Sequence, residues 1–331
     1  MRIGSNPNID KSLDLNETSH RVIIPIYIPN AEGYFKDSFN VFKVCIESLL
    51  CTINKDTAVS LVSNGSSSEV NEYITELWIQ GKINRVVFNK ENVGKMNAII
   101  TETRASFEEF ITYSDADVFF DKNWLEQTFR IFYDIPKAGF VSMNPTPVFY
   151  LHSCSTLLDN ICTVLFSKKK VNNVCSFDDL EHFHKSIGKD NNYTNSIFSK
   201  DVLCVGNEKK YIIGAGHFCC TIRKTPTLRF VPLEKSKIGA SGGSESAYLD
   251  IPFDKTGLWR LSSSKAYVWH MGNVLEREWA VEKLKTITQF KEDDFTFQTL
   301  PYRDITWLSR LVPYVIRCKI ISVLKKIKNF K

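Results

Sequence analysis

Short apolar runs alternate with amphipathic segments along the first half of the chain. Residues 21–28 form a near-continuous apolar run, which is typical of a strand buried on both faces of a parallel sheet. Phe39, Phe42, Ile46 and Leu49 then recur at the spacing of one helix face. The alternation continues with predicted strands at 58–63, 85–89, 110–114 and 138–143, and predicted helices at 69–80, from 94, and at 121–133. This order predicts a doubly wound α/β sheet with its site at the carboxyl ends of the strands.

The pattern is less regular in the second half. Residues 145–210 combine an apolar, helical segment at 157–166 with a polar stretch rich in Asn, Lys and Asp, and the pattern leaves their topology open. Regular structure is predicted again as strands at 218–223 and 266–270, and as helices from 244 and at 275–290. No internal repeat is visible.

Composition excludes several classes of protein. The chain has 331 residues, 43% hydrophobic and 12% aromatic, which is enough for a sizeable core and unlike a disordered chain. No apolar run reaches the roughly 18 residues of a membrane-spanning helix. Residues 1–20 lack the apolar core of a secretory signal. The nine cysteines form no CxxC pair, so we expect reduced thiols in a cytoplasmic protein.

The net charge of +5 is concentrated at the C-terminus, because residues 301–331 carry eight basic side chains and one acid. Pro313 is placed to start a helix there. Apolar residues recur at helical spacing at Ile316, Ile320, Val323, Leu324, Ile327 and Phe330. A basic amphipathic helix of this kind binds anionic membrane surfaces, although the same stripe would also suit packing on the domain. We expect no nucleic-acid partner, because no aromatic–basic interleaving accompanies the charge.

Two carboxylates follow the predicted strand at 110–114. Asp115 and Asp117 are alternate residues, so both side chains can point the same way from the strand's carboxyl end. Converging carboxylates repel each other unless a cation lies between them, and Mg²⁺ or Mn²⁺ prefers such oxygen ligands. Such an ion neutralises the charge of a leaving diphosphate. A solvated turn is the alternative interpretation of an isolated pair.

Loops after the earlier strands add polar groups at the same sheet edge. They are residues 25–27, 63–66 and 89–98. Gly94 permits close backbone approach at a helix start, where amides favour an anion, and Lys95 offers a charged contact to phosphate.

With these loops and the acidic pair, the sequence resembles the inverting family 2 glycosyltransferases, which have the GT-A fold. The resemblance covers about residues 21–290 and is weakest over 145–210. It implies a nucleotide site, with Asn64 standing where an Asp is usual and still able to contact a base edge. The implied donor residues are Pro25, Tyr27, Asn64, Gly65, Asn92, Gly94, Lys95, Asp115 and Ala116.

The same resemblance supplies a base and a third metal ligand. Glu245 aligns with the family's catalytic acid, which takes the proton of the attacking sugar hydroxyl. The family's acidic pair is broken, because Ser244 and Ser246 flank Glu245, so Asp250 is the second candidate for the base. His270 aligns with a histidine that completes the metal shell in some members, together with Asp115 and Asp117.

We therefore expect a metal-dependent inverting glycosyltransferase with a GT-A-like doubly wound mixed sheet. Its donor would be a nucleoside-diphosphate sugar, with UDP expected, and its acceptor a hydroxyl of a glycan or lipid-linked glycan at the cytoplasmic face of a membrane. The expected divisions are a polar segment at 1–20, a nucleotide-binding half at 21–145, an acceptor half at 146–295 and a basic tail at 296–331. A degenerate sugar-binding or assembly subunit and a nucleotidyltransferase are the alternatives.

Overall fold

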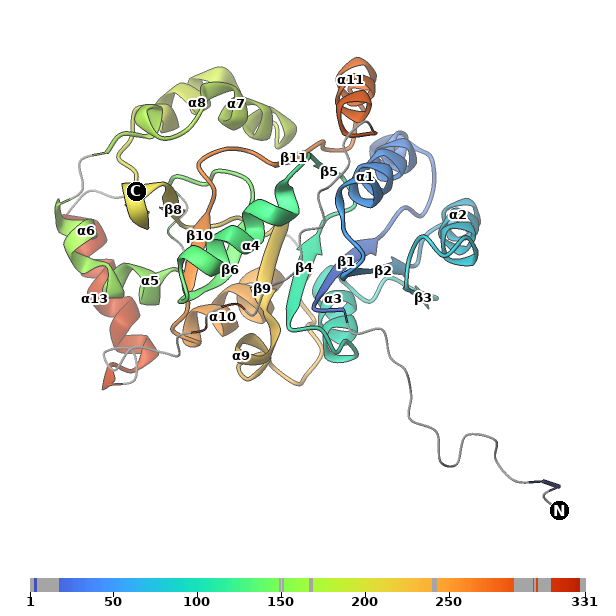
Figure 1. The fold of residues 1–331 in the computed structure, drawn as a ribbon, viewed down its shortest axis with the longest axis horizontal. Coiled ribbons are helices and arrows are strands. Elements are labelled where there is room, and N and C mark those ends of the chain that lie inside the picture. The colour runs from blue at the N-terminus through green and yellow to red at the C-terminus, as the bar shows by residue number, and fades with distance from the viewer. Residues whose placement is uncertain are drawn as a thin grey trace.

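The structure is a computed structural model that describes residues 3–4, 18–148, 150, 152–166, 169–239, 243–288, 300, 302 and 311–327. Within these residues the main sheet has nine strands (Figure 1). Across the sheet they are β3 (Arg85–Asn89), β2 (Thr57–Asn64), β1 (His20–Ile26), β4 (Phe110–Ser114), β9 (Cys219–Arg223), β6 (Ala138–Ser142), β10 (Trp259–Ser262), β8 (Tyr211–Ile213) and β7 (Cys204–Val205). Strands β3, β2, β1 and β4 are parallel, whereas β9 runs antiparallel between β4 and β6. The predicted mixed doubly wound sheet is confirmed.

Helices cover both faces of this sheet. Along β1, Val22 and Ile24 point into one core, while Ile23 points into the other, as expected for a strand buried on both faces. The first core is covered by α1 (Ser38–Thr52), α2 (Ser68–Ile79), α4 (Trp124–Asp134) and α5 (Cys154–Asp159). The second core is covered by α3 (Lys95–Arg104), α9 (Lys224–Leu228) and α10 (Ile251–Lys255).

The segment whose topology the pattern left open is largely helical. The helical segment expected at 157–166 is confirmed, as two short helices, α5 and α6 (Ile161–Phe166), with Asn160 between them. The pair α7 (Phe177–Ser186) and α8 (Asn191–Phe198) follows, with the short 3₁₀ turns η2 (Val171–Asn173) and η3 (Asn207–Lys209) on either side. Val171, Leu180 and Ile212 form a third small core beneath this pair.

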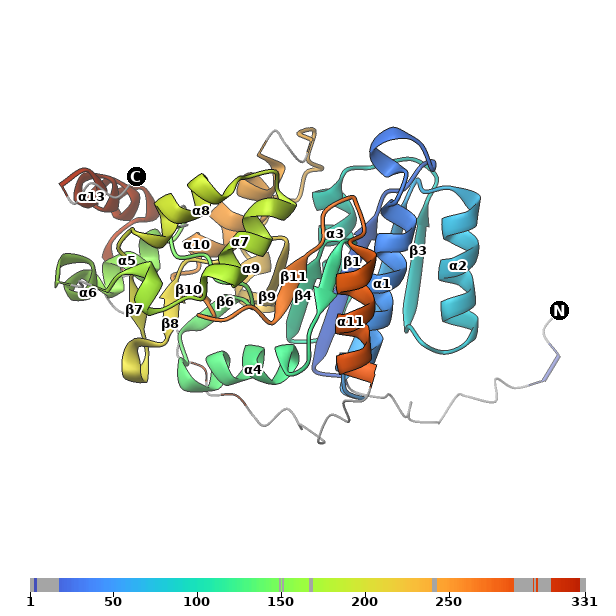
Figure 2. The same ribbon diagram turned by 90° about the horizontal axis from the view of Figure 1, so that it is seen from above.

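A second, two-stranded sheet lies above the carboxyl ends of the main strands. It pairs β5 (Val118–Phe120) with β11 (Val268–His270) in antiparallel register, so that Val118 faces His270. Helix α11 (Arg277–Thr288) packs beside α1, as Figure 2 shows. The pattern predicted β11, two residues too long, but not β5. This small sheet matters because it joins the acidic pair to the second half of the chain.

Two further expectations concern the second half. The helix expected from residue 244 is confirmed: residues 244–245 are helical, the π-helical turn η5 (Ser246–Asp250) follows, and it continues into α10. The expected tail helix is present as α13 (Tyr314–Ile327), directly after Pro313, and it packs on α5. Residues 1–2, 5–17, 289–299, 303–310 and 328–331, including Phe330, lie outside the described part of the chain. Among the described helices, none combines the length and apolarity needed to cross a bilayer.

Candidate active site

The structure brings Asp115, Asp117 and His270 together. Asp115 follows β4, Asp117 precedes β5, and β11 ends at His270, so the β5–β11 pairing sets the histidine beside the acids. The backbone N–H of Met271 donates to the Asp117 carbonyl at 2.7 Å and fixes this approach. One ligand atom from each of the three side chains lies within 4.8 Å of the others. Octahedral Mg²⁺ or Mn²⁺ holds its oxygen ligands at about 2.0–2.2 Å, so this spacing suits a single ion.

The charges at this cluster favour a cation. Asp117 Oδ1 is buried and has no hydrogen-bond partner among the described residues. Burial raises the pKa of Asp117 and the nearby Asp115 carboxylate raises it further, whereas His270 and Lys95 lower it, and the net direction is upward. A buried carboxylate without enough counter-charge is the situation that a bound cation relieves.

His270 is held in the orientation that a metal ligand needs. Its Nδ1 lies 3.0 Å from the hydroxyl of Ser186, and that hydroxyl donates its only hydrogen to the Phe183 carbonyl at 2.7 Å. In its neutral form the imidazole therefore carries its proton on Nδ1, and Nε2 presents a lone pair 3.5 Å from Asp117 Oδ2. Two acceptors facing each other repel unless a cation or proton lies between them. Ser186 lies in the segment that sequence reasoning left open, and no motif identified it.

A cleft of about 540 Å³ extends from the acids along the carboxyl ends of β1 and β2. The predicted residues that line it are Pro25, Tyr27, Asn64, Asn92, Lys95, Asp115, Ala116, Asp117 and Glu245. Tyr27 is 43% exposed and Tyr34 is 69% exposed, and both rings pack edge-on against Phe35 in the 3₁₀ turn η1 (Gly33–Phe35). This aromatic group at the cleft wall offers flat surfaces for stacking a base, and only Tyr27 was identified from the sequence.

Asn64 does not play the role that the resemblance implied. It is only 2% exposed, and its side-chain oxygen accepts from the backbone N–H of Val93 at 3.0 Å and from Asn89 Nδ2 at 3.3 Å. Its side-chain nitrogen donates to Asn92 Oδ1 at 2.8 Å. Both ends of the amide therefore fasten the loop after β3, so the structure does not favour a base-edge contact.

The predicted glycines shape the same loops. Gly65 has φ +82°, and a Cβ there would lie 2.9 Å from the backbone nitrogen of Asn92. Gly94 has φ +90° and caps α3, and its N–H donates to Asn92 Oδ1 at 2.8 Å. Neither glycine lines the cleft. Their role is to let two strand-end loops approach each other closely.

Lys95 links the cluster of Asp115, Asp117 and His270 to the candidate base. Its Nζ lies 2.5 Å from Asp115 Oδ1 and 3.8 Å from Glu245 Oε1. Burial lowers the pKa of Lys95, but Asp115 above all, together with Glu245 and Asp117, outweighs burial, and the net shift is upward. The amine therefore remains protonated and is placed to contact an anionic diphosphate.

The two candidates for the base lie in different surroundings. Glu245 lines the cleft and immediately precedes η5, and the Ser244 hydroxyl donates to its Oε2 at 3.1 Å. Asp250 is 1% exposed and pairs with the fully buried Arg260, with His217 Nδ1 3.8 Å away. A carboxylate already paired with a buried guanidinium is a structural anion, so the structure does not bring Asp250 to the cleft.

His152 is a neighbour of Glu245 that the sequence did not reveal. Its Nε2 lies 3.2 Å from the hydroxyl of Ser246, the first residue of η5. His152 also has φ +54°, an uncommon conformation for a residue with a side chain. This contact braces the turn that presents the candidate base. Its only signal was a histidine in an unplaced segment.

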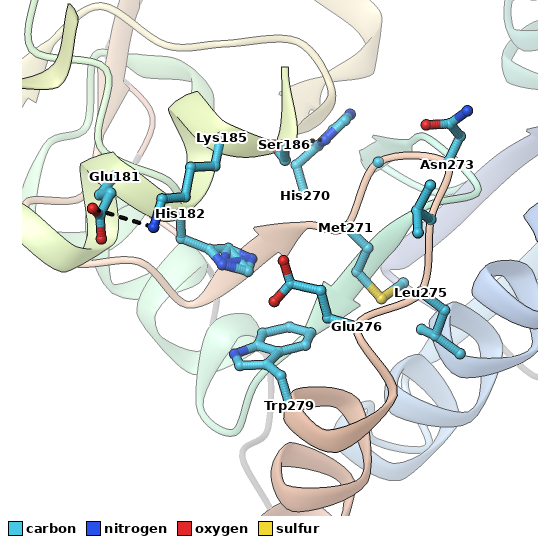
Figure 3. A pocket seen from close by; sticks show the side chains of 12 residues that line it. Glu181, His182, Lys185, Ser186, His270, Met271, Asn273, Leu275, Glu276 and Trp279 are labelled. Atoms are coloured by element: carbon cyan, nitrogen blue, oxygen red, sulfur yellow. Dashed lines mark hydrogen bonds and ion pairs between the residues drawn. The ribbon is translucent and has the colours of Figure 1, made fainter. Parts of the chain in front are cut away.

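A second pocket, of about 350 Å³, opens on the other side of His270. Figure 3 shows it between the end of α7 and the loop that joins β11 to α11. The rings of His182 and Trp279 stack there with centroids 4.8 Å apart, and Glu276 points towards them. Gly272 lines both pockets, so this loop is the wall between them.

The mixed sheet and the cleft at its carboxyl edge define a GT-A fold. Residues 22–147 match the family model of Glycosyl transferase family 2. The match ends where the sequence resemblance is weakest. A comparison with curated proteins found no match.

Solved structures of glycosyltransferases are similar to parts of the chain. S. aureus TarS 1-349 is 18% identical over 40% of this chain and 40% of its own, with a TM-score of 0.33. Its complex with UDP-GlcNAc gives the same identity and score over 38% of that chain. The mannosyltransferase PcManGT from Pyrobaculum calidifontis, in complex with GDP-Man and Mn²⁺, is 12% identical over 86% of this chain and 70% of its own, with a TM-score of 0.43. This chain therefore spans about two fifths of the first two structures.

Proposed function

We propose that the protein is a metal-dependent, inverting glycosyltransferase that uses a nucleoside-diphosphate sugar, with UDP as the expected nucleotide. The acceptor is a hydroxyl of a glycan or lipid-linked glycan, in the synthesis of surface polysaccharide. The observation that carries the proposal is the convergence of Asp115, Asp117 and His270, in which Asp117 Oδ1 has no partner among the described residues, beside a cleft that also holds Glu245. The part of the chain that matches the family model, residues 22–147, contains the first two of these residues.

The residues divide the work of the reaction between them. Asp115, Asp117 and His270 would hold Mn²⁺ or Mg²⁺, which when bound neutralises the charge of the departing diphosphate. Tyr27 and Pro25 line the wall against which the nucleoside rests, and Lys95 contacts its phosphates. Glu245 accepts the proton of the acceptor hydroxyl as that oxygen attacks the anomeric carbon. A single base and a direct displacement invert the anomeric centre.

The division of the chain follows from this assignment. Residues 21–145 form the nucleotide-sugar half, with His20 joining them as the first residue of β1, and residues 146–295 form the acceptor half. Pro25, Lys95 and the two aspartates come from the first half, whereas Glu245 and His270 come from the second. Catalysis therefore requires both halves.

We also propose that the C-terminal helix meets an anionic membrane surface at the cytoplasmic face. The predicted apolar stripe is divided in the structure, because Ile320 and Leu324 pack against the main core. Ile316 (47%) and Val323 (56%), beside them on the helix, are exposed, as is Val315 (63%). Exposed lysines accompany them at Lys319 and Lys326. Apolar and basic side chains on one outward face suit an anionic interface.

The membrane proposal is tested with sedimentation of vesicles. Full-length protein should pellet with vesicles that contain anionic lipid and remain in solution with neutral ones. Replacing Val323 and Ile316 by Ser should weaken this binding, whereas replacing the exposed Val281 of α11 by Ser should not. Unchanged binding by the α13 variant would show that this face is not the contact.

The catalytic proposal is tested by ligand-induced stabilisation. UDP, GDP, CMP and dTDP are each added with and without Mn²⁺, and the Tm of the protein is measured by thermal unfolding. A ligand at ~100 times its dissociation constant adds about 2.7 kcal/mol, which raises the Tm by a few degrees. Asp117→Asn should abolish the Mn²⁺-dependent part, while Asp201→Asn, an exposed acid paired with Lys170, should leave it intact.

Glu245→Gln separates an enzyme from a sugar-binding or assembly subunit. An enzyme loses turnover with this substitution but keeps donor stabilisation, because the amide cannot accept the proton. Hydrolysis or transfer of the donor sugar is followed in the presence of glycan acceptors. A nucleotide response with no turnover by the wild-type protein on any acceptor would favour the subunit. No response to any nucleotide would refute the proposed donor site.

A further inference from the structure

A second group of metal-binding side chains lies away from the cleft, where three helices meet. Cys154 begins α5, Asp254 is in α10, and Cys318 is in α13. One ligand atom from each of the three lies within 4.8 Å of the others. In Figure 1, α5 and α13 lie side by side, and α10 also contacts α5. Residues separated by up to 164 positions in sequence thus converge on one point.

We propose that Cys154, Asp254 and Cys318 bind a zinc ion that fastens the C-terminal helix to the acceptor half. Two thiolates and a carboxylate match the sulfur and oxygen ligands of Zn²⁺, whereas Mg²⁺ and Mn²⁺ prefer oxygen alone. Three protein ligands leave a fourth position in a tetrahedral site. The hydroxyl of Tyr314 is hydrogen-bonded with Cys318 and, with water, is the group at hand to fill it.

The carboxylate is already oriented for this role. Asp254 is 1% exposed, and its Oδ2 and Oδ1 accept from the backbone N–H groups of Cys154 and Ser155, each at 3.0 Å. Each carboxylate oxygen has a second lone pair, so these bonds leave room for a metal. Ligating carboxylates are usually held by such outer hydrogen bonds, which fix their direction.

The surrounding charge suits a dication bound by two thiolates. Arg317 is 5% exposed, donates to the Ser155 hydroxyl, and its Nε has no partner among the described residues. It forms no ion pair within that part of the chain. Two thiolates and the Asp254 carboxylate carry three negative charges, which one Zn²⁺ and the Arg317 guanidinium neutralise together. A buried cation next to the ligands therefore supports thiolate ligation rather than opposing it.

The position of this site gives it a structural purpose. Helix α10 directly continues η5, the turn that follows Glu245, and α5 supports β10 in the main sheet. A zinc ion joining α5, α10 and α13 would fix the tail to the same framework that presents the candidate base. This site is independent of the proposed glycosyl transfer, because it shares no residue with the cleft.

The test uses full-length protein purified under reducing conditions without a polyhistidine tag. Bound zinc is measured by mass spectrometry of the elements, and Co²⁺ is then substituted for it. Thiolate ligation gives a sulfur-to-cobalt charge-transfer band in the near ultraviolet. The cluster of Asp115, Asp117 and His270 contains no sulfur and cannot produce this band, so the two sites are distinguished in one spectrum.

We expect one zinc per chain and a strong band in the wild type. Cys154→Ser and Cys318→Ser should each lose most of the band and the zinc, whereas Cys162→Ser, an exposed cysteine of α6, should lose neither. Asp117→Asn should also keep the band, so failure of the catalytic site leaves this result intact. Because a serine variant can misfold, zinc protection of the wild-type thiols from alkylation is a second readout.

Three results would overturn the proposal. One is wild-type protein without zinc that also gives no cobalt–thiolate band. Another is a band that survives in both Cys154→Ser and Cys318→Ser. The third is alkylation of Cys154 and Cys318 at the same rate with and without zinc, measured by peptide mass spectrometry against Cys162 as the reference.

Discussion

Acidification should destabilise the protein through one buried histidine at the start of β1. His20 is 0% exposed, and its two ring nitrogens lie 3.2 Å from Thr57 Oγ1 and 2.7 Å from Thr112 Oγ1. It thereby ties β1 to both neighbouring strands. Burial lowers the pKa of His20 to about 3, since the nearby Glu108 only partly offsets the loss of hydration. His20 is therefore neutral in the folded protein at neutral pH.

The sign of the effect follows from the two protonation states. The unfolded chain binds a proton at His20 near pH 6.5, but the folded chain does so only near pH 3. Stability is therefore complete above pH 6.5 and falls as the pH decreases, until both states are protonated. Between pH 8 and pH 5 the loss from this residue is about 2 kcal/mol. Arg21 holds the pKa of Glu108 at about 2, against the cost of its burial, so Glu108 adds little above pH 5.

The assay is urea unfolding of the wild type and His20→Gln at several pH values between 5 and 8. Glutamine can still bond to the threonine hydroxyls but does not titrate, so its free energy of unfolding should depend less on pH by about 2 kcal/mol over this range. His182, His184 and His217, whose pKa values are also lowered by burial, are present in both proteins and cancel in the comparison. Equal pH dependence in the two proteins would refute the reasoning.

Three further outcomes follow from the geometry. Gly65→Ala should lower the free energy of unfolding, measured in urea, by about 1–3 kcal/mol. The loss should exceed that of Gly81→Ala, because Gly81 also has a positive φ but has open space for a Cβ. Equal losses would contradict the predicted clash. Arg260→Met leaves the Asp250 carboxylate buried and unpaired, so it should cost about 3–5 kcal/mol in the same assay, and a loss near zero would mean that the pair is not buried in solution. Lys95→Met removes the cation that competes with a metal ion for Asp115, so Mn²⁺ should bind about tenfold more tightly. The affinity is measured by titration followed by electron paramagnetic resonance, and an unchanged affinity would show that Lys95 does not compete at Asp115.

The strands and helices of residues 21–145 were predicted well because their signals in the sequence are local. Residues 21–28 are apolar on both faces of the strand, and structure confirms a strand there, beginning one residue earlier at His20. The order of loops after successive parallel strands then places Asn64, Lys95 and Asp115 at one sheet edge without any knowledge of side-chain contacts. The pattern could not predict which partners each side chain contacts. Asn64 is directed into the loop after β3 by hydrogen bonds to residues 25–29 positions away.

The second half was harder to predict because its contacts are long-range. Strand β5 has three residues, and it forms only because β11 pairs with it from about 150 positions later in the chain. Ser186, which fixes the position of the proton on His270, lies at the end of α7, 84 residues earlier in the chain. A short strand and a single hydroxyl leave no periodic trace in the sequence. The chain nevertheless carries His270 at the end of its strand, and the family resemblance identified it for that reason.

The two ends of the candidate site are positioned by different structural elements. The aspartates follow a buried strand of the main sheet, and His270 is held by the β5–β11 register, so the metal-binding end is positioned by backbone pairing. Glu245 instead precedes a π-helical turn, a form that is frequent at functional sites. Lys95 is the direct link between the two ends, at 2.5 Å from Asp115 and 3.8 Å from Glu245. A cation that arrives at Asp115 repels Lys95, so loading of the proposed metal site changes the charge that Glu245 meets.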